Sequence, residues 1–174
     1  MAKYWKPILQ TVLALSLVFA PAAQAAAPAT AHVQAVQDLL GAMQVEKVLR
    51  GVASRSRYQS DAQRQAVFAK IDKTPPAEVY QRLAPALAAV ISADTAAEMT
   101  RFYHTPYGQQ VIYRKYNNRG GIMMPGMREV VPPEEKKERK RAAYVNASTE
   151  LAKAEPVIEH EAFKLLQAIN KEKR

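Results

Sequence analysis

The sequence predicts an all-α protein, a small bundle of about six to seven helices that follows a cleaved signal peptide. Alanine is abundant, β-branched residues are sparse, and no stretch alternates between apolar and polar residues over the length of a strand. Apolar residues instead recur at helical spacing between glycine and proline breaks. The 174 residues are 48% hydrophobic and 24% charged, a balance that excludes a disordered polyelectrolyte and a polytopic membrane protein.

The first 25 residues have the three parts of a secretory signal peptide. Lys3 and Lys6 give a positive start, residues 8–20 form an uncharged apolar run, and residues 23–25 read Ala-Gln-Ala, a cleavage site. A transmembrane anchor is the alternative, but 13 apolar residues fall short of the roughly 20 that a span needs. We therefore expect an exported protein, in the periplasm of a bacterium, without a transmembrane anchor.

Residues 26–174 are expected to form a single helical domain. Loss of two lysines and no acidic residue lowers the net charge from +9 to +7. The chain has no cysteine, which excludes disulfides, thiol nucleophiles and Cys-ligated metal centres. The stability of the domain must therefore come from packing.

The first part of this domain should hold three helices, over about 30–40, 44–54 and from Asp61 onward, with a loop at 55–60. Gly41 is expected to stop the first of them. The apolar positions expected to face the core are Val33, Val36, Leu39, Leu40, Val45, Val48, Leu49, Val52, Ala62, Ala66, Val67 and Ile71.

Prolines mark the starts of the next helices. Thr74 is expected to cap a helix that begins at Pro75-Pro76, reaches Ile91 and is kinked at Pro85. Ser92 or Asp94 should cap a helix that ends at Phe102-Tyr103, and the following helix should end near Tyr116 or Asn117. The inward positions expected here are Val79, Leu83, Leu87, Val90, Ile91, Met99, Phe102, Tyr103, Val111 and Ile112.

The end of the chain divides into an irregular Met- and Gly-containing segment at 117–132 and a C-terminal helical segment at 133–174. Pro156 should break or bend the latter. Its last part should turn an apolar face inward, made of Val157, Ile158, Phe163, Leu166 and Ile169.

The most specific stretch of the chain is Phe-Tyr-His-Thr-Pro-Tyr-Gly-Gln at 102–109. With the Leu-x-x-x-Leu-x-x-Val-Ile-Ser segment before it, this stretch resembles the exported bacterial domain-of-unknown-function family twenty fifty-nine, whose members carry Phe-Tyr-x-Ser/Thr-Pro-x-Gly-Gln/Lys. The matching residues are Phe102, Tyr103, Thr105, Pro106, Gly108 and Gln109. The resemblance covers about 74–116, a family-like core, and implies a signal peptide and a small helical domain. It implies no activity, because the family has no agreed function.

The same residues can be interpreted without the family. Thr105 and Pro106 restart a helix immediately after another ends, and Gly108 allows a neighbouring element to approach closely. We expect a helix–helix corner that organises the bundle. A ligand pocket at the corner is the alternative.

No catalytic or metal-binding arrangement stands out, and neither catalysis nor a cofactor is expected. His32, His104 and His160 lie far apart in the sequence, and no Gly-x-Ser-x-Gly, Ser-x-x-Lys or His-Glu-x-x-His motif is present. The methionines at 123–127 could hold a soft metal such as Cu(I), but a hydrophobic loop that docks on the bundle or on a partner is the favoured interpretation.

Basic and aromatic side chains gather on and after the helix that starts at Pro106. They form a candidate binding surface made of Tyr107, Tyr113, Arg114, Lys115, Tyr116, Arg119 and Arg128. An exported protein rarely meets nucleic acid, so an envelope protein or an anionic envelope component is the expected partner. A second basic cluster at 136–141 is partly offset by glutamates. The oligomeric state stays open.

The expected function is therefore binding or assembly in the cell envelope, without catalysis. One alternative is a small envelope enzyme, or a pocket for an amphipathic ligand, built around His104 and Tyr107. Another is an exported immunity or inhibitor protein.

One weak internal similarity remains, at a spacing of 40 residues. Val90, Glu98 and Arg101 match Val130, Glu138 and Arg141. Two ordinary helix starts explain the match as well as a duplication does.

Overall fold

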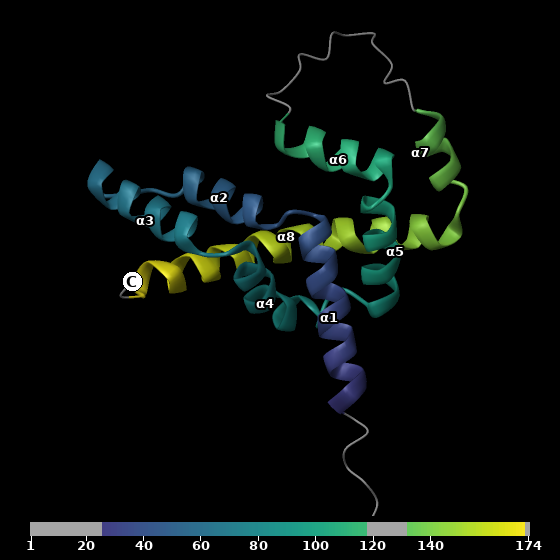
Figure 1. Ribbon diagram of the computed structural model, residues 1–174, viewed down its shortest axis with the longest axis horizontal. Coiled ribbons are helices and arrows are strands. Elements are labelled where there is room, and N and C mark those ends of the chain that lie inside the picture. The colour runs from purple at the N-terminus through teal and green to yellow at the C-terminus, as the bar shows by residue number, and fades with distance from the viewer. Residues whose placement is uncertain (1–25, 118–131, 173–174) are drawn as a thin grey trace, which may run out of the picture.

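The computed structural model describes residues 26–117 and 132–172, and in these ranges it is helical without strands (Figure 1). The expected all-α class is confirmed. The helices are α1 (Ala26–Ala42), α2 (Glu46–Arg55), α3 (Asp61–Lys73), α4 (Pro76–Leu87), α5 (Ala93–Tyr103), α6 (Pro106–Asn117), α7 (Pro133–Glu138) and α8 (Ala142–Lys171). None of the described helices has the length and hydropathy of a membrane span. The predicted signal peptide lies outside the described residues.

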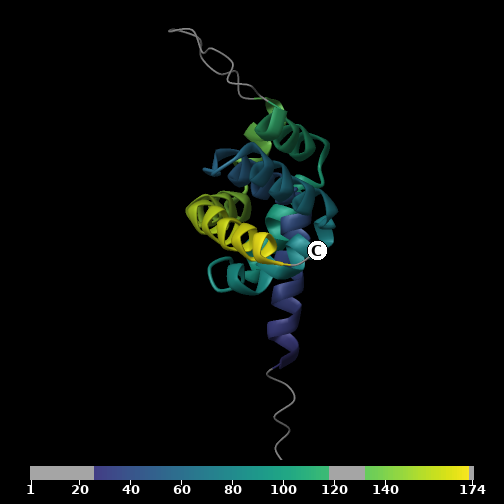
Figure 2. The same cartoon turned by 90° about the vertical axis from the view of Figure 1, so that its left-hand side faces the viewer.

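The 30-residue helix α8 runs along the length of the molecule and organises the rest of the bundle (Figure 1). Helices α2, α3 and α4 pack on its C-terminal half, α5 packs on its N-terminal half, and α1 packs on α4 and α5. Figure 2 shows α6 and α7 together at the end of the molecule opposite the first turns of α1.

The core is one cluster of apolar side chains from most of these helices. The largest fully buried ones are Phe102, Leu39, Leu40, Met43, Leu49, Leu87, Ile91, Ile112 and Ile169. Most positions expected to face inward do so. Ala62 and Ala66 are exposed instead, and Phe163 is 43% exposed, because α3 and the end of α8 lie at the margin of the bundle.

The turn between α1 and α2 differs from the expectation that Gly41 ends the first helix. The helix continues through Gly41 to Ala42, and Gln44 takes the left-handed conformation with φ of 54°. The amide of Val45 donates to the carbonyl of Leu40 at 3.1 Å, which closes the helix end around Gln44. A Cβ at position 41 would meet the ring of Tyr80 at 3.4 Å, so Gly41 faces a packed neighbour.

Thr74 closes the preceding helix instead of opening the next one, so its expected role as an N-cap is wrong. Its hydroxyl donates to the carbonyl of Lys70 at 2.9 Å, and Pro75 is the N-cap of α4. Helix α4 contains Pro85, as expected, but ends at Leu87. Val90, beyond that end, is 42% exposed rather than inward-facing.

The C-terminal segment breaks at 139–141 and not at Pro156. Helix α8 runs through Pro156, whose position is exposed. A proline within a helix leaves the carbonyl four residues earlier, that of Ala152, without its usual amide partner, and Ala152 is itself an exposed residue. The expected break at this proline is therefore wrong, and the alternative, a bend, stays a prediction.

Two glutamates and two arginines join α5 to the start of the C-terminal segment. The Arg101 guanidinium lies 2.8 Å from the Glu98 carboxylate and 2.7 Å from that of Glu138. The Arg141 guanidinium lies 2.7 Å from Glu98 and 2.9 Å from Glu138. Each arginine thus bridges both carboxylates, and we call these four residues the Glu/Arg quartet.

The quartet shifts the titration of its carboxylates. Hydrogen bonds from Arg101, and then from Arg141, hold the pKa of Glu98 below its ordinary value of 4.5 in spite of burial. For Glu138 burial acts most strongly and opposes the shift, but the same two arginines outweigh it and the pKa is again lowered. Their contribution to stability is complete above the pKa of the unfolded chain and is lost as pH falls through the lower folded value.

We predict that the Glu98→Gln/Glu138→Gln double variant melts at a lower temperature than the parent at neutral pH and loses less stability on acidification below pH 4.5. The double variant should still lose some stability at acid pH, because Glu135 and Glu150 also have lowered pKa values. Thermal melts followed by circular dichroism measure both effects. Glu134→Gln, at an exposed position of α7, is the matched control. Identical pH profiles for the double variant and the parent would contradict the role given to the quartet.

Candidate functional site

The motif at 102–109 forms the corner between α5 and α6. The Thr105 hydroxyl donates to the carbonyl of Phe102 at 2.7 Å and accepts from the amide of Gly108 at 3.0 Å. One side chain therefore closes the end of α5 and caps the start of α6, where Pro106 is the first residue. The sequence predicts this corner, and the geometry agrees with it.

Gly108 lies where no side chain fits. A Cβ built on it would lie 2.0 Å from the carbonyl oxygen of Phe102 and 2.7 Å from the Cα of Tyr103. Both neighbours are backbone atoms, so neither can rotate away. The two helices thus meet backbone to backbone at this position.

Aromatic rings pack around the corner. The Phe102 ring is buried, with its centroid 4.8 Å from that of Tyr144 and 6.0 Å from that of Tyr107. The side-chain amide of Gln109 donates to the carbonyl of Tyr103, and burial raises the pKa of the Tyr103 phenol. Five of the six motif residues therefore have a contact at the corner, and the sixth, Pro106, begins α6.

Tyr107 belongs to this packed interior and not to an exposed face, so that part of the expected binding surface is wrong. Its hydroxyl donates to the Glu135 carboxylate at 2.5 Å, and its side chain is buried. The Arg114 guanidinium covers its ring, 5.7 Å from the centroid. Burial, and then the bond to Glu135, raise the pKa of Tyr107. The sequence predicts correctly that Tyr107 lies on α6, but it does not predict that the ring faces the core.

Two further residues of the expected surface attach α6 to the bundle. The hydroxyl of half-buried Tyr116 donates to the carbonyl of Met43 at 2.8 Å, and burial raises its pKa. The ammonium group of Lys115 lies 2.5 Å from the Glu155 carboxylate on α8. The hydrogen bond to Met43 therefore holds the far end of α6 at the turn that follows α1, and the exposed Lys115–Glu155 pair adds little to it.

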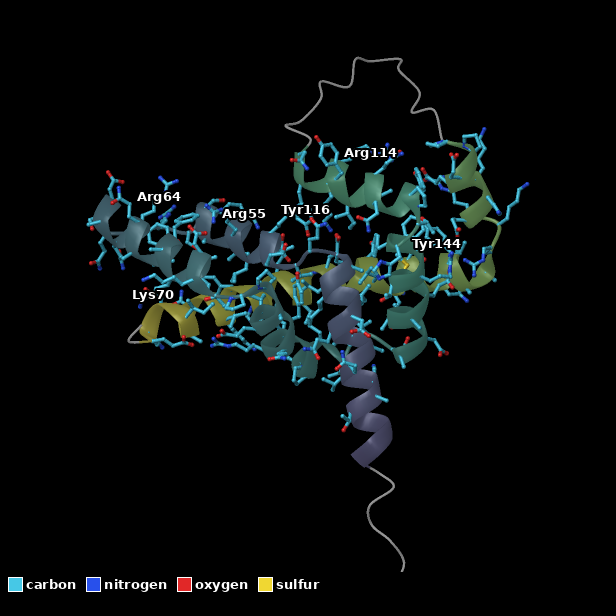
Figure 3. All side chains as sticks on the ribbon, viewed as in Figure 1. Arg55, Arg64, Lys70, Arg114, Tyr116 and Tyr144 are labelled. Carbon is cyan, nitrogen blue, oxygen red and sulfur yellow. The ribbon has the colours of Figure 1, made fainter. Side chains whose placement is uncertain are left out.

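The outer face of α6 consists of the residues of the expected surface that do not attach α6 to the bundle. Tyr113 is 68% exposed, and Arg114 lies beside it on the outer side of the helix, whereas Tyr116 points to the bundle (Figure 3). We call Tyr113 and Arg114, with exposed Gln110, the α6 outer face. Arg119, Arg128 and the methionines at 123–127 lie outside the described residues.

A groove of about 350 Å³ adjoins α6 on its other side. Its walls come from α2, α6 and α8, and Lys115 and Glu155 stand at its rim. The apolar residues that line it are Met43, Val48, Ala152, Pro156 and Ile158. Sequence reasoning missed this groove because its residues come from three separate segments that only the fold brings together.

The three histidines stay apart in the structure. His104 is exposed at the end of α5, His160 is exposed on α8, and the ring of His32 lies 2.7 Å from the carbonyl oxygen of Ile91. Because the hydroxyl of Tyr107 is bound to Glu135, a site built around His104 and Tyr107 gains no support. Within the described ranges, no three His, Asp or Glu side chains gather as a metal site would require.

We predict that Gly108→Ala destabilises the fold by about 2–4 kcal/mol, because the added methyl group collides with backbone. Gly51→Ala is the matched control. A Cβ there meets only the mobile end of Arg55 at 3.5 Å, so the variant should gain about 0.5–1 kcal/mol from helix propensity. Chemical denaturation of both variants measures the difference, and equal stabilities would show that the corner is looser than described.

Comparison of the chain with protein-family models, with curated proteins and with solved structures found no match in any of the three. The resemblance of the motif at 102–109 to family twenty fifty-nine therefore stays a prediction, and the conclusions that follow rest on the geometry of this chain.

Proposed function

We propose that this protein is exported to the bacterial periplasm and binds an envelope protein through the α6 outer face, without catalysis. The observation that carries the proposal is that α6 is fixed at both ends while Tyr113 and Arg114 project outward. The exported location rests on the signal-peptide pattern of the first 25 residues.

Fixing α6 in advance favours binding because less conformational freedom is lost when a partner docks. The corner at Gly108 and the Tyr116–Met43 hydrogen bond contribute most to this fixation, since the Lys115–Glu155 pair is exposed. None of these contacts uses the side chain of Tyr113, whose ring stays available.

The residue types on the α6 outer face also suit a protein partner. Tyrosine and arginine are the residues that most often dominate the energy of protein interfaces, because they offer a large rigid surface and hydrogen-bond donors. The Arg114 guanidinium lies 5.7 Å from the centroid of the Tyr107 ring and remains exposed to solvent. An acidic or carbonyl-rich patch on the partner would complement it.

We predict that a photo-crosslinking amino acid at position 113, in the full chain in living cells, yields one discrete adduct. The adduct should weaken at least several-fold when Arg114→Glu is added. Gel analysis followed by mass spectrometry of the adduct measures this. The matched control is the same photo-crosslinker at Lys73, exposed at the end of α3. A smear equal at both positions, or an adduct indifferent to Arg114→Glu, would remove the α6 outer face from the proposal.

Export has its own test. We predict that the chain found in the periplasmic fraction begins at Ala26, or one or two residues later, because residues 23–25 present the cleavage site. N-terminal sequencing of that fraction measures the position. Replacing Ala23 and Ala25 by bulky residues should leave the uncut chain with the membrane. An uncut chain in the cytoplasm of the parent strain would contradict the proposed location.

A further inference from the structure

The end of the molecule opposite α7 forms an arm made of α2, α3 and the C-terminal half of α8 (Figure 1). Its tip is the loop at 56–60 together with the adjoining turns of the three helices. Two hollows meet at this tip and share Ser56 and Tyr58 in their linings. The tip takes no part in the corner or in the α6 outer face.

The first hollow is amphipathic and has a volume of about 270 Å³. Val67, Leu166 and Phe163 supply its apolar part, and Arg57 stands at its edge. Phe163 is 43% exposed, one of the few large apolar side chains in the described residues that the bundle leaves open to water. An exposed ring beside a buried apolar floor favours an occupant that brings apolar atoms of its own.

The second hollow is polar, with a volume of about 450 Å³. It offers the hydroxyl of Ser60 and the guanidinium of Arg64, with the Asp61 carboxylate also in its lining. The Ser54 hydroxyl at its edge already donates to the carbonyl of Gly51 at 2.7 Å. The Tyr58 hydroxyl donates to the carbonyl of Ala53 at 2.8 Å, which holds the wall between the two hollows in place. Hydroxyl and guanidinium donors of this kind suit phosphate oxygens.

The loop side of the tip carries a positive charge, and the adjoining turns of α8 add Glu159, Glu161 and Lys164. Residues 55–64 hold three arginines and one aspartate. Arg57 is exposed and forms no ion pair with a described residue, while Arg64 lies over the Phe68 ring at 5.8 Å. Figure 3 shows Arg64 on the arm, at the end far from Arg114. The Arg55–Glu159 pair spans 3.3 Å between two side chains that are each more than 60% exposed, so it is weak and readily exchanged.

We infer that the tip of the arm docks on the surface of an anionic phospholipid bilayer. Phe163 enters the interface between headgroups and acyl chains, and Arg57 and Arg64 bind phosphate groups on either side of Tyr58. A soluble polyanion would meet the arginines but leave Phe163 and the apolar floor in water. A lipid surface offers phosphate groups to the arginines and an apolar environment to Phe163. This inference uses none of the residues of the α6 outer face, so it stands or falls separately from the proposed function.

The test is co-sedimentation of residues 26–174, which contain the whole of the described core, with lipid vesicles. Vesicles of phosphatidylcholine with phosphatidylglycerol should bind the protein, and vesicles of phosphatidylcholine alone should bind it much more weakly. The Arg57→Glu/Arg64→Glu variant should lose binding about tenfold or more, and Phe163→Ser about fivefold or more.

Two control variants lie at the opposite end of the molecule. Lys140→Glu makes the same kind of charge change as the arginine variants, and Val145→Ser removes another exposed apolar side chain, 41% exposed, from α8. Both should bind vesicles as the parent does. Circular dichroism melts confirm that each variant is folded, as expected for exposed positions.

Three results would overturn the inference. One is equal binding to neutral and anionic vesicles. Another is vesicle binding that survives the arginine reversals. The third is binding that ignores Phe163→Ser and is displaced by dextran sulfate, which would identify a polyanion site instead of a lipid surface.

Discussion

The carbonyl oxygen of Phe102 occupies the space that any side chain at position 108 would need, and the position of α6 depends on this contact. Because the two backbones touch, α6 leaves α5 in one direction only, which places Tyr107 over the core and Tyr116 against Met43. Tyr113 lies on the part of the helix surface that neither of these two tyrosines occupies, and it is 68% exposed. A single residue type thus determines which face of α6 the protein shows.

Capping residues and prolines in the sequence predicted the helix starts that depend on short-range hydrogen bonds. The Ser92 cap, the start of α6 at Pro106 and the restart of helix at Asp61 all depend on side chains bonding to nearby backbone. Errors arose where the chain has two arrangements available and the sequence does not say which one it takes. Thr74 turns to α3 and not to α4, and Pro156 stays within a helix because its side of α8 faces water.

The candidate site shows the same division. Helical periodicity placed the tyrosines and Arg114 on one helix, but it could not tell that Glu135, 28 residues away, accepts the Tyr107 hydroxyl. The Glu/Arg quartet is the instructive case, because its members are the same glutamates and arginines that repeat at a spacing of 40 residues. A pattern that carried little weight in the sequence marks residues that meet in the fold, whether or not a duplication produced it.

The unbroken course of α8 has a mechanical consequence. At about 1.5 Å per residue, its 30 residues form a strut of roughly 45 Å. Lys115 of α6 pairs with Glu155 near the middle of α8, and α2 and α3 pack on the C-terminal half of α8. A partner bound to the α6 outer face would therefore lie at a fixed distance from a surface bound to the arm. If both proposed contacts form, the length of α8 sets the separation between them, as in a spacer rather than a flexible tether.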